Sequence, residues 1–171
     1  HMAAEFIVNP AALQAVMACF LIPYGLSQFV YGPLSDRLGR KPIIISGLII
    51  YLLGTLVTLF AQDYSLFLLG CFIQGAGIGC GGTMARTLTR DCFEGTDLHR
   101  ANSLISMCII FCPLLAPLLG GYLTETTGWR NSYLFLALFA AAVLLTMITS
   151  FKETLPVERR NAAPVWENYR Y

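Results

Sequence analysis

Five long runs of apolar residues, joined by short polar connections, restrict the possible fold more than any other feature of this sequence. A helix needs about 20 apolar residues to cross the hydrocarbon core of a membrane, which is about 30 Å thick. The chain is 56% hydrophobic and only 12% charged, whereas a soluble domain carries about 25% charged residues. No run shows the alternation that is typical of a membrane-spanning strand. The sequence therefore predicts an all-α membrane protein with transmembrane helices at 11–31, 42–61, 66–88, 101–123 and 129–151.

The connections between these runs indicate how the predicted helices are arranged. Those at 62–65 and 124–128 are so short that neighbouring helices should be antiparallel and form one bundle. The chain then divides into an external N-terminal segment (1–10), a transmembrane bundle (11–151) and a cytoplasmic tail (152–171).

Basic residues indicate which side of the membrane each connection faces, because short cytoplasmic loops are enriched in Lys and Arg. Apart from Arg130, all basic residues lie in the first connection, around the third connection or after the last run. This distribution predicts that these segments are cytoplasmic. The start at His1-Met2 is typical of a vector remnant or an internal cut, so we expect a further span to precede the chain. The net charge of +1 gives no reason to expect a nucleic-acid partner.

The first connection is the part of the sequence that is most informative about function. It concentrates ionisable residues and glycines between two uncharged runs, namely Gly32, Asp36, Arg37, Gly39, Arg40 and Lys41. Fixing the topology through the basic residues is the simpler interpretation, but that role requires neither an Asp nor two glycines. We therefore expect these residues to form a gating motif.

Polar and aromatic side chains inside two runs are candidates for a substrate cavity. A stripe in the first run recurs at spacings of three and four, which places on one helix face Met17, Phe20, Tyr24, Ser27, Gln28 and Tyr31. Phe20, Tyr24 and Gln28 suit a cavity for a flat, apolar solute, and ordinary helix packing is the alternative. Gln74 lies in the middle of the third run, where its amide needs a partner, and either a solute or a second helix would supply one.

Glycines and prolines of the third and fourth runs indicate close helix packing. The third run contains two pairs of glycines four residues apart, a spacing that lets helix backbones approach each other. In the fourth run Pro117, Gly120 and Gly121 offer a smooth surface to a neighbour, and we expect this run to be buried in the bundle. The six cysteines are interpreted as small packing residues. Because no catalytic or metal-binding cluster is evident, we expect neither an enzyme nor a cofactor.

Together these motifs resemble those of the major facilitator superfamily and, within it, the Bcr/CflA-type (EmrD-like) drug:proton antiporters. The signature between the second and third spans of that family is matched by Gly32, Leu34, Asp36, Arg37, Gly39, Arg40 and Lys41. The signatures of its fourth and fifth spans are similar to Gln74-Gly75 with Gly77 and to Pro117-Leu-Leu-Gly120-Gly121. The resemblance covers about residues 13–156 and corresponds to spans two to six, within the N-terminal half of a twelve-span transporter.

Two positions depart from the family pattern. Cys71 stands where many members have an Arg that is associated with proton handling, and Ala116 stands where the fifth-span signature has its first Gly. No Asp or Glu lies inside the five runs, although a buried carboxylate is the usual proton carrier in such transporters. A proton carrier would then lie in another part of the transporter or near the membrane surface.

The resemblance implies a function as part of a secondary transporter of the bacterial inner membrane. Such a protein exports small hydrophobic or amphipathic compounds by alternating access, with protons as the coupling ion, and needs its first span and C-terminal half. In it Asp36 would accept hydrogen bonds from a helix start in the other half, and Arg40 and Asp91 would orient Asp36. The alternatives are a metabolite importer with the same fold and a helical membrane interaction protein without transport.

Overall fold

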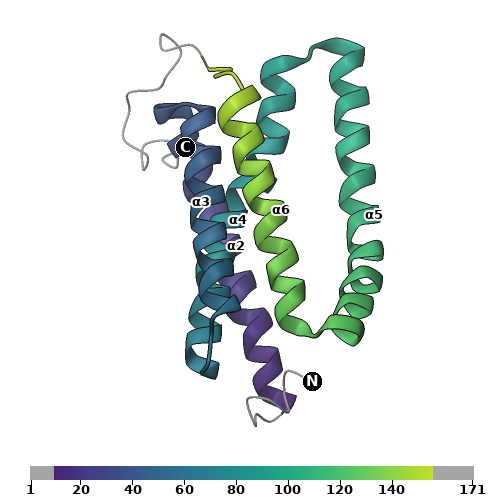
Figure 1. Cartoon of the computed structure of the whole chain (residues 1–171). Helices are drawn as coiled ribbons and strands as arrows, with labels where there is room; N and C mark the ends of the chain where they lie inside the picture. The colour runs from purple at the N-terminus through teal and green to yellow at the C-terminus, as the bar shows by residue number, and fades with distance from the viewer. Residues whose placement is uncertain (1–9, 156–171) are drawn as a thin grey trace.

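The computed structural model describes residues 10–155, and in this part the chain forms five long helices (Figure 1). Their bounds are Pro10–Leu38 (α2), Arg40–Leu59 (α3), Tyr64–Cys92 (α4), Gly95–Thr127 (α5) and Trp129–Ser150 (α6). Each helix is long and apolar enough to cross a membrane. The prediction of an all-α protein with five transmembrane helices is thereby confirmed.

The helices are longer than predicted, most of all at one end of the bundle. We call this the signature end, defined by the α2–α3 junction, the α4–α5 junction and the last turn of α6, which lie at the top of Figure 1. The sequence predicted loops at 32–41 and 89–100, but α2 continues to Leu38, and only Phe93 and Glu94 separate α4 from α5. The prediction was wrong here because charged residues were taken to end the helices. Beyond the hydrocarbon core water solvates charged side chains, so the backbone can keep its helical hydrogen bonds.

α4 lies at the centre of the packing and has its most extensive contacts with α3 and α2. Its glycines explain why the helices come so close. A Cβ added to Gly75 or Gly79 would overlap backbone or side-chain atoms of α2, and one added to Gly77 would overlap the backbone of α3 at Tyr51. Glycine at these positions therefore brings helix backbones into direct contact, which favours van der Waals packing where lipid provides no hydrophobic driving force.

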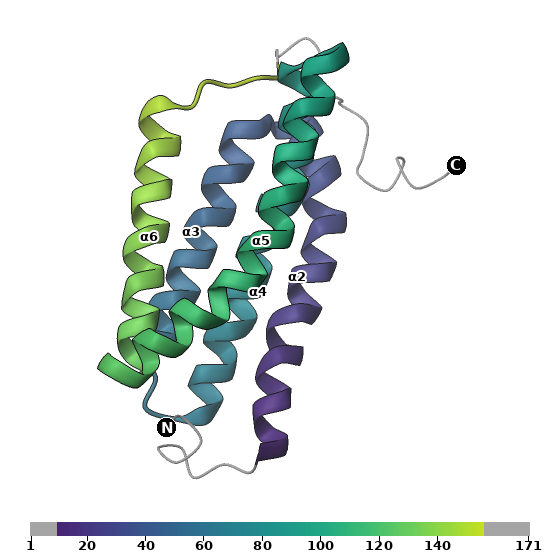
Figure 2. The same ribbon diagram turned by 90° about the vertical axis from the view of Figure 1, so that its right-hand side faces the viewer.

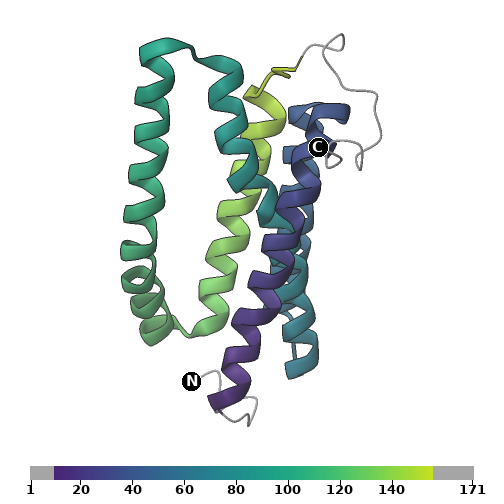
Figure 3. The same ribbon diagram turned by 180° about the vertical axis from the view of Figure 1, so that it is seen from behind.

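α5 stands apart from α2 and α3, and is joined to α4 at one end and to α6 at the other (Figures 1 and 3). None of the residues in its most apolar part is buried. The expected burial of the fourth run is therefore wrong for the described part of the chain. α5 also continues as a helix through Pro113 and Pro117.

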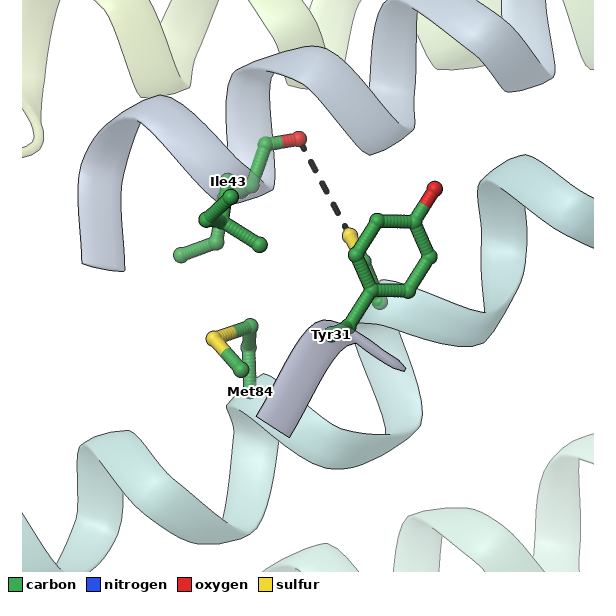
Figure 4. Packing of buried hydrophobic residues seen from close by; sticks show 5 residues of the cluster. Tyr31, Ile43 and Met84 are labelled. Carbon is green, nitrogen blue, oxygen red and sulfur yellow. Dashed lines mark hydrogen bonds between the residues drawn. The ribbon is translucent and has the colours of Figure 1, made fainter. Parts of the chain in front are cut away.

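Two buried clusters hold the bundle together. At the signature end, Tyr31 of α2 packs with Ile43 and Ile44 of α3 and with Cys80 and Met84 of α4 (Figure 4). The Cys80 thiol donates to the Ile44 carbonyl oxygen at 3.9 Å, the dashed line of Figure 4. Tyr31 thus belongs to the buried core of the bundle.

The second cluster lies at the opposite end and is built around three aromatic rings. Phe67 of α4 contacts the rings of Trp129 and Tyr133 of α6 edge to face, with centroids 5.7 and 5.8 Å away. Ala61 and Cys71 complete this cluster. Trp129 is only 5% exposed. Edge-to-face contacts with Phe67 explain its burial.

Candidate functional site

The α2–α3 junction is a turn of one residue, Gly39. Its φ of +103° lies in the region that side chains disfavour, so glycine is required between the two helices. The Gly39 backbone N–H donates to the Ser35 carbonyl oxygen at 3.1 Å and closes the last turn of α2. This tight junction places Arg40 in the first turn of α3, directly beside the last turns of α2.

Arg40 is the centre of the candidate gating motif and is only 6% exposed. Its Nη1 donates to Asp36 Oδ1 and to Ser35 Oγ, both at 2.6 Å, and its Nε donates to Asp91 Oδ2 at 2.9 Å. Asp36 and Ser35 belong to α2 and Asp91 to α4, so one guanidinium joins three helices. The structure thus brings together Asp36, Arg40 and Asp91, three of the residues that the sequence analysis selected.

The two carboxylates around Arg40 differ in exposure. The Asp91 side chain is 23% exposed, whereas that of Asp36 is 46% exposed. One cation therefore faces two anions, and the more accessible anion is Asp36. A carboxylate can accept several hydrogen bonds, so Asp36 keeps acceptor capacity toward a group outside the described chain.

Glu153 also takes part in this site, a contact that the sequence analysis did not predict. Its carboxylate accepts hydrogen bonds from the backbone N–H groups of Arg40 at 2.8 Å and of Lys41 at 3.1 Å. The first turn of α3 contains no acidic residue, and its N-cap Gly39 makes no side-chain hydrogen bond. Glu153 supplies the missing acceptor from the segment after α6. The available signal was that neither Gly39 nor the first turn of α3 offers a side-chain acceptor, so the first N–H groups of the helix need an acceptor from elsewhere.

Lys41 makes a second contact between the start of α3 and the end of α6. Its Nζ donates to the carbonyl oxygens of Ile148 at 2.9 Å and Phe151 at 2.7 Å, at the C-terminal end of that helix. A cation at a helix C-terminus and an anion at a helix N-terminus are both favoured by the helix dipoles. Lys41 and Glu153 therefore link the ends of α3 and α6 reciprocally.

The remaining members of the motif have simpler surroundings. Gly32 accepts a hydrogen bond from Ser35 Oγ at 2.7 Å through its carbonyl oxygen, and it faces Thr83 of α4. Arg37 is half-buried, and among the described residues it forms no ion pair.

The four cavity candidates divide between two cavities. Phe20 and Gln74 line one of about 390 Å³ between α2, α3, α4 and α6. Tyr24 and Gln28 line a larger one of about 730 Å³ between α2, α4 and α5. The rings of Phe20, in the smaller cavity, and Tyr24, in the larger one, are stacked with centroids 6.3 Å apart. The predicted stripe of the first run is thus not one surface, because Ser27 and Tyr31 contact α4 instead.

Gln74 has the interhelical partner that one of its two interpretations required. Its Nε2 donates to Thr55 Oγ1 of α3 at 2.8 Å, and that hydroxyl in turn donates to the Tyr51 carbonyl oxygen at 2.8 Å. The amide is buried at 4% exposure. Gln74 thus joins α4 to α3, and solute contact through the smaller cavity stays a prediction.

The proline and glycines of the fourth run face open space in the described part of the chain. A Cβ added to Gly120 or Gly121 would meet no atom within 4 Å. Their predicted packing therefore requires a partner outside residues 10–155, and it stays a prediction.

Comparison with known proteins identifies the family. The model of a protein family described as Major Facilitator Superfamily matches residues 1–168. The chain belongs to the major facilitator superfamily.

Two bacterial multidrug resistance proteins are similar to this chain. Multidrug resistance protein D of Escherichia coli K12 is 46% identical over 157 residues, which are 92% of this chain and 40% of that protein. Multidrug resistance protein MdtL of Citrobacter koseri is 30% identical over 156 residues, which are 91% of this chain and 40% of that protein. The predicted likeness to EmrD-like members is confirmed, and the chain is a multi-pass protein of the bacterial inner membrane. The chain spans about 40% of the length of these relatives.

A solved structure shows that the helices have the arrangement of this superfamily. The crystal structure of the human organic anion transporter MFSD10 (TETRAN) superposes with a TM-score of 0.75 at 24% sequence identity, covering 87% of this chain and 34% of that chain. At this identity the likeness concerns the fold alone.

The family membership gives weight to the departure at Cys71. This residue lies in the second buried cluster, beside Phe67 and Trp129, and also lines the smaller cavity. An Arg would be placed here among apolar and aromatic neighbours, whereas Cys fills the position as a small apolar residue.

Proposed function

We propose that this chain is part of a secondary transporter that exports small hydrophobic or amphipathic compounds by alternating access coupled to protons. The name of the E. coli relative, Multidrug resistance protein D, supports export of drug-like compounds. In this proposal the protein is not an enzyme. The first span and the C-terminal half belong to the complete transporter, and the signature end faces the cytoplasm, where Lys and Arg are enriched.

The observation that carries the proposal is the arrangement around Arg40. The guanidinium holds Asp36 by a 2.6 Å hydrogen bond at the end of α2 and leaves its side chain 46% exposed. An anion held at this position suits a helix N-terminus in the other half of the transporter, because the positive end of the helix dipole attracts it. Asp36 would then close the cytoplasmic side in one state and release the helix in the other.

The larger cavity supports small-molecule cargo. Its volume of about 730 Å³ falls in the range of about 300–1,000 Å³ that is usual for small-molecule sites. Its lining combines Phe29 and Ile109 with the polar groups of Tyr24 and Gln28. Thr83, Thr87 and two arginines, Arg86 and Arg90, complete the polar part of the lining. A cavity with both apolar and polar side chains suits amphipathic compounds.

The test uses the complete gene, expressed in a bacterial strain that lacks its main drug pumps. We expect lower accumulation of a fluorescent lipophilic dye in expressing cells, and we expect D36N to restore accumulation to nearly the level of cells without the gene. Asp97→Asn is the matched control, because Asp97 lies on α5 and pairs only loosely with Arg100 at 3.8 Å.

Three outcomes separate the parts of this proposal. Equal dye accumulation with and without the wild-type gene rejects export of that class of compound. Normal export by D36N, at normal membrane abundance, rejects the gate. Export that persists after collapse of the proton gradient, with the other ion gradients intact, rejects coupling to protons.

A further inference from the structure

The larger cavity has positive charge on one side. It is lined by residues from α2, α4 and α5, namely Tyr24, Gly25, Gln28, Phe29, Gly82, Thr83, Arg86, Thr87, Arg90 and Ile109. Figure 2 views this side of the molecule, with α5 in front of α4 and α2 beside them. Two of these lining residues are arginines and none is acidic.

The two arginines are available for a ligand. Arg86 and Arg90 are both exposed and lie one turn apart on α4, so their side chains share one helix face. Within residues 10–155 neither forms an ion pair. The acidic residue next to Arg90 is Asp91, whose carboxylate accepts a hydrogen bond from Arg40 at 2.9 Å. The nearest carboxylate in the sequence is thus already paired with another cation.

Neutral hydrogen-bonding groups converge beside these arginines. A Cβ at Gly82 would lie 3.4 Å from the Tyr24 hydroxyl and 3.9 Å from Gln28 Nε2, so both polar ends reach α4 at this residue. Gly82 is one turn before Arg86. The hydroxyls of Thr83 and Thr87 donate to backbone carbonyl oxygens at 3.4 and 3.0 Å. The donors left for an anion are therefore the guanidinium groups, the Gln28 amide and the Tyr24 hydroxyl.

The position along α4 also suits an amphipathic molecule. α4 has 29 residues, about 44 Å of helix, whereas the hydrocarbon core is about 30 Å thick. Arg86 and Arg90 lie in its last two turns, near the membrane surface, while the apolar residues Phe29 and Ile109 line the same cavity. A ligand could place its charged group at the arginines and its apolar body against these residues.

We propose that Arg86 and Arg90 make this cavity select amphipathic compounds with a carboxylate or sulfonate group over compounds with an amine. A guanidinium binds a carboxylate or sulfonate through two parallel hydrogen bonds. An ammonium ligand has no acceptor for these bonds, and its positive charge is repelled by the guanidinium. This inference rests on the proposed transport function and names the class of substrate.

The experiment measures energised uptake into inverted membrane vesicles that contain the complete protein. Three probes share one apolar body, namely pyrenebutyrate, pyrenebutylamine and the neutral pyrenebutanol. We expect the wild type to transport pyrenebutyrate faster than pyrenebutylamine. In R86Q/R90Q the ratio of the two rates should fall at least about tenfold, the loss expected for one charge-assisted hydrogen bond.

Two further variants control this result. R86K/R90K keeps the charge without the paired donors and should give an intermediate ratio. Arg100→Gln removes a basic residue whose side chain is 83% exposed and does not line the cavity, so it should keep the wild-type ratio. If the double variant does not reach the membrane, the same ratio of rates is measured for R86Q and for R90Q alone. Each single variant should lower the ratio by less than the double variant.

The possible failures are distinguishable. An unchanged ratio in the glutamine variants, or a wild-type preference for pyrenebutylamine, overturns the role of the arginines. If pyrenebutanol and both charged probes are moved equally well, transport stands and the selectivity does not. If none of the three probes is moved, the proposed function fails and this inference fails with it.

Discussion

Arg40 shows how one buried residue can determine the balance of charge at a site. It is 6% exposed and lies between two carboxylates that would otherwise repel each other. Asp36 and Asp91 are partly exposed, so water screens part of this repulsion. Even so, removal of the cation leaves two anions close together beside a buried space.

Arg40→Met should therefore destabilise the complete protein, and the added change Asp91→Asn should recover part of the loss. The first change removes hydrogen bonds at 2.6 and 2.9 Å, and the second relieves repulsion between the carboxylates. We expect a loss of about 2 kcal/mol for R40M, below the range of fully buried pairs. The midpoint of thermal unfolding in detergent measures the loss in R40M and the recovery in R40M/D91N. An R40M/D91N protein that is less stable than R40M would contradict the argument from charge repulsion.

Glu153 offers a second prediction at the scale of one residue. Its carboxylate accepts from the N–H groups of Arg40 and Lys41 at the N-terminus of α3. Because Glu153 is exposed, we expect Glu153→Ala to cost only about 1 kcal/mol. Thermal unfolding measures the loss, with Glu125→Ala on exposed α5 as control. Equal midpoints for the two variants would show that the link between α3 and α6 does not stabilise the protein.

At the scale of elements, the sequence predicted the helices well and their junctions poorly. An apolar run of about 20 residues that crosses a membrane must form a helix, because only a helix pairs all backbone groups within the segment. The α2–α3 turn depends instead on the positive φ of Gly39. The sequence alone does not distinguish Gly39 from the other glycines of the first connection and the third run. Asp36 and Asp91 could be selected from a family signature. The contact that Glu153 makes could not be predicted in this way, because its partners are backbone N–H groups, which do not depend on residue type.

The glycines of α4 provide a matched comparison. Gly77→Ala should destabilise the protein by about 1–3 kcal/mol, the usual cost of overpacking, because its Cβ would overlap the backbone of α3. Gly81→Ala, on the same helix, adds a Cβ that meets no atom within 4 Å and should have little effect. Thermal unfolding in detergent compares the two. A Gly81→Ala protein as unstable as Gly77→Ala would mean that helix contacts at Gly77 are not the cause.

At the scale of the whole molecule, one face of α5 has no neighbouring helix among residues 10–155. Its apolar residues are exposed along most of the helix, and Gly120 and Gly121 meet no neighbour. In a membrane, exposed apolar residues are compatible with lipid, so exposure alone does not identify a partner. Glycines on a lipid-facing surface have no packing role, which supports further helices of the complete transporter as the neighbours of this surface.

The orientation of the whole molecule gives the last prediction. Cys92 is exposed at the signature end, where the distribution of basic residues predicts the cytoplasm. A membrane-impermeant maleimide should therefore label the complete protein in inverted vesicles but not in intact cells, and C92A should remove this label. Gln62→Cys places a thiol on an exposed residue at the opposite end and should react in intact cells. Labelling of Cys92 from outside the cell would invert the topology. It would also place Asp36 at the periplasmic side, where the proposed gate could no longer close the cytoplasmic entrance.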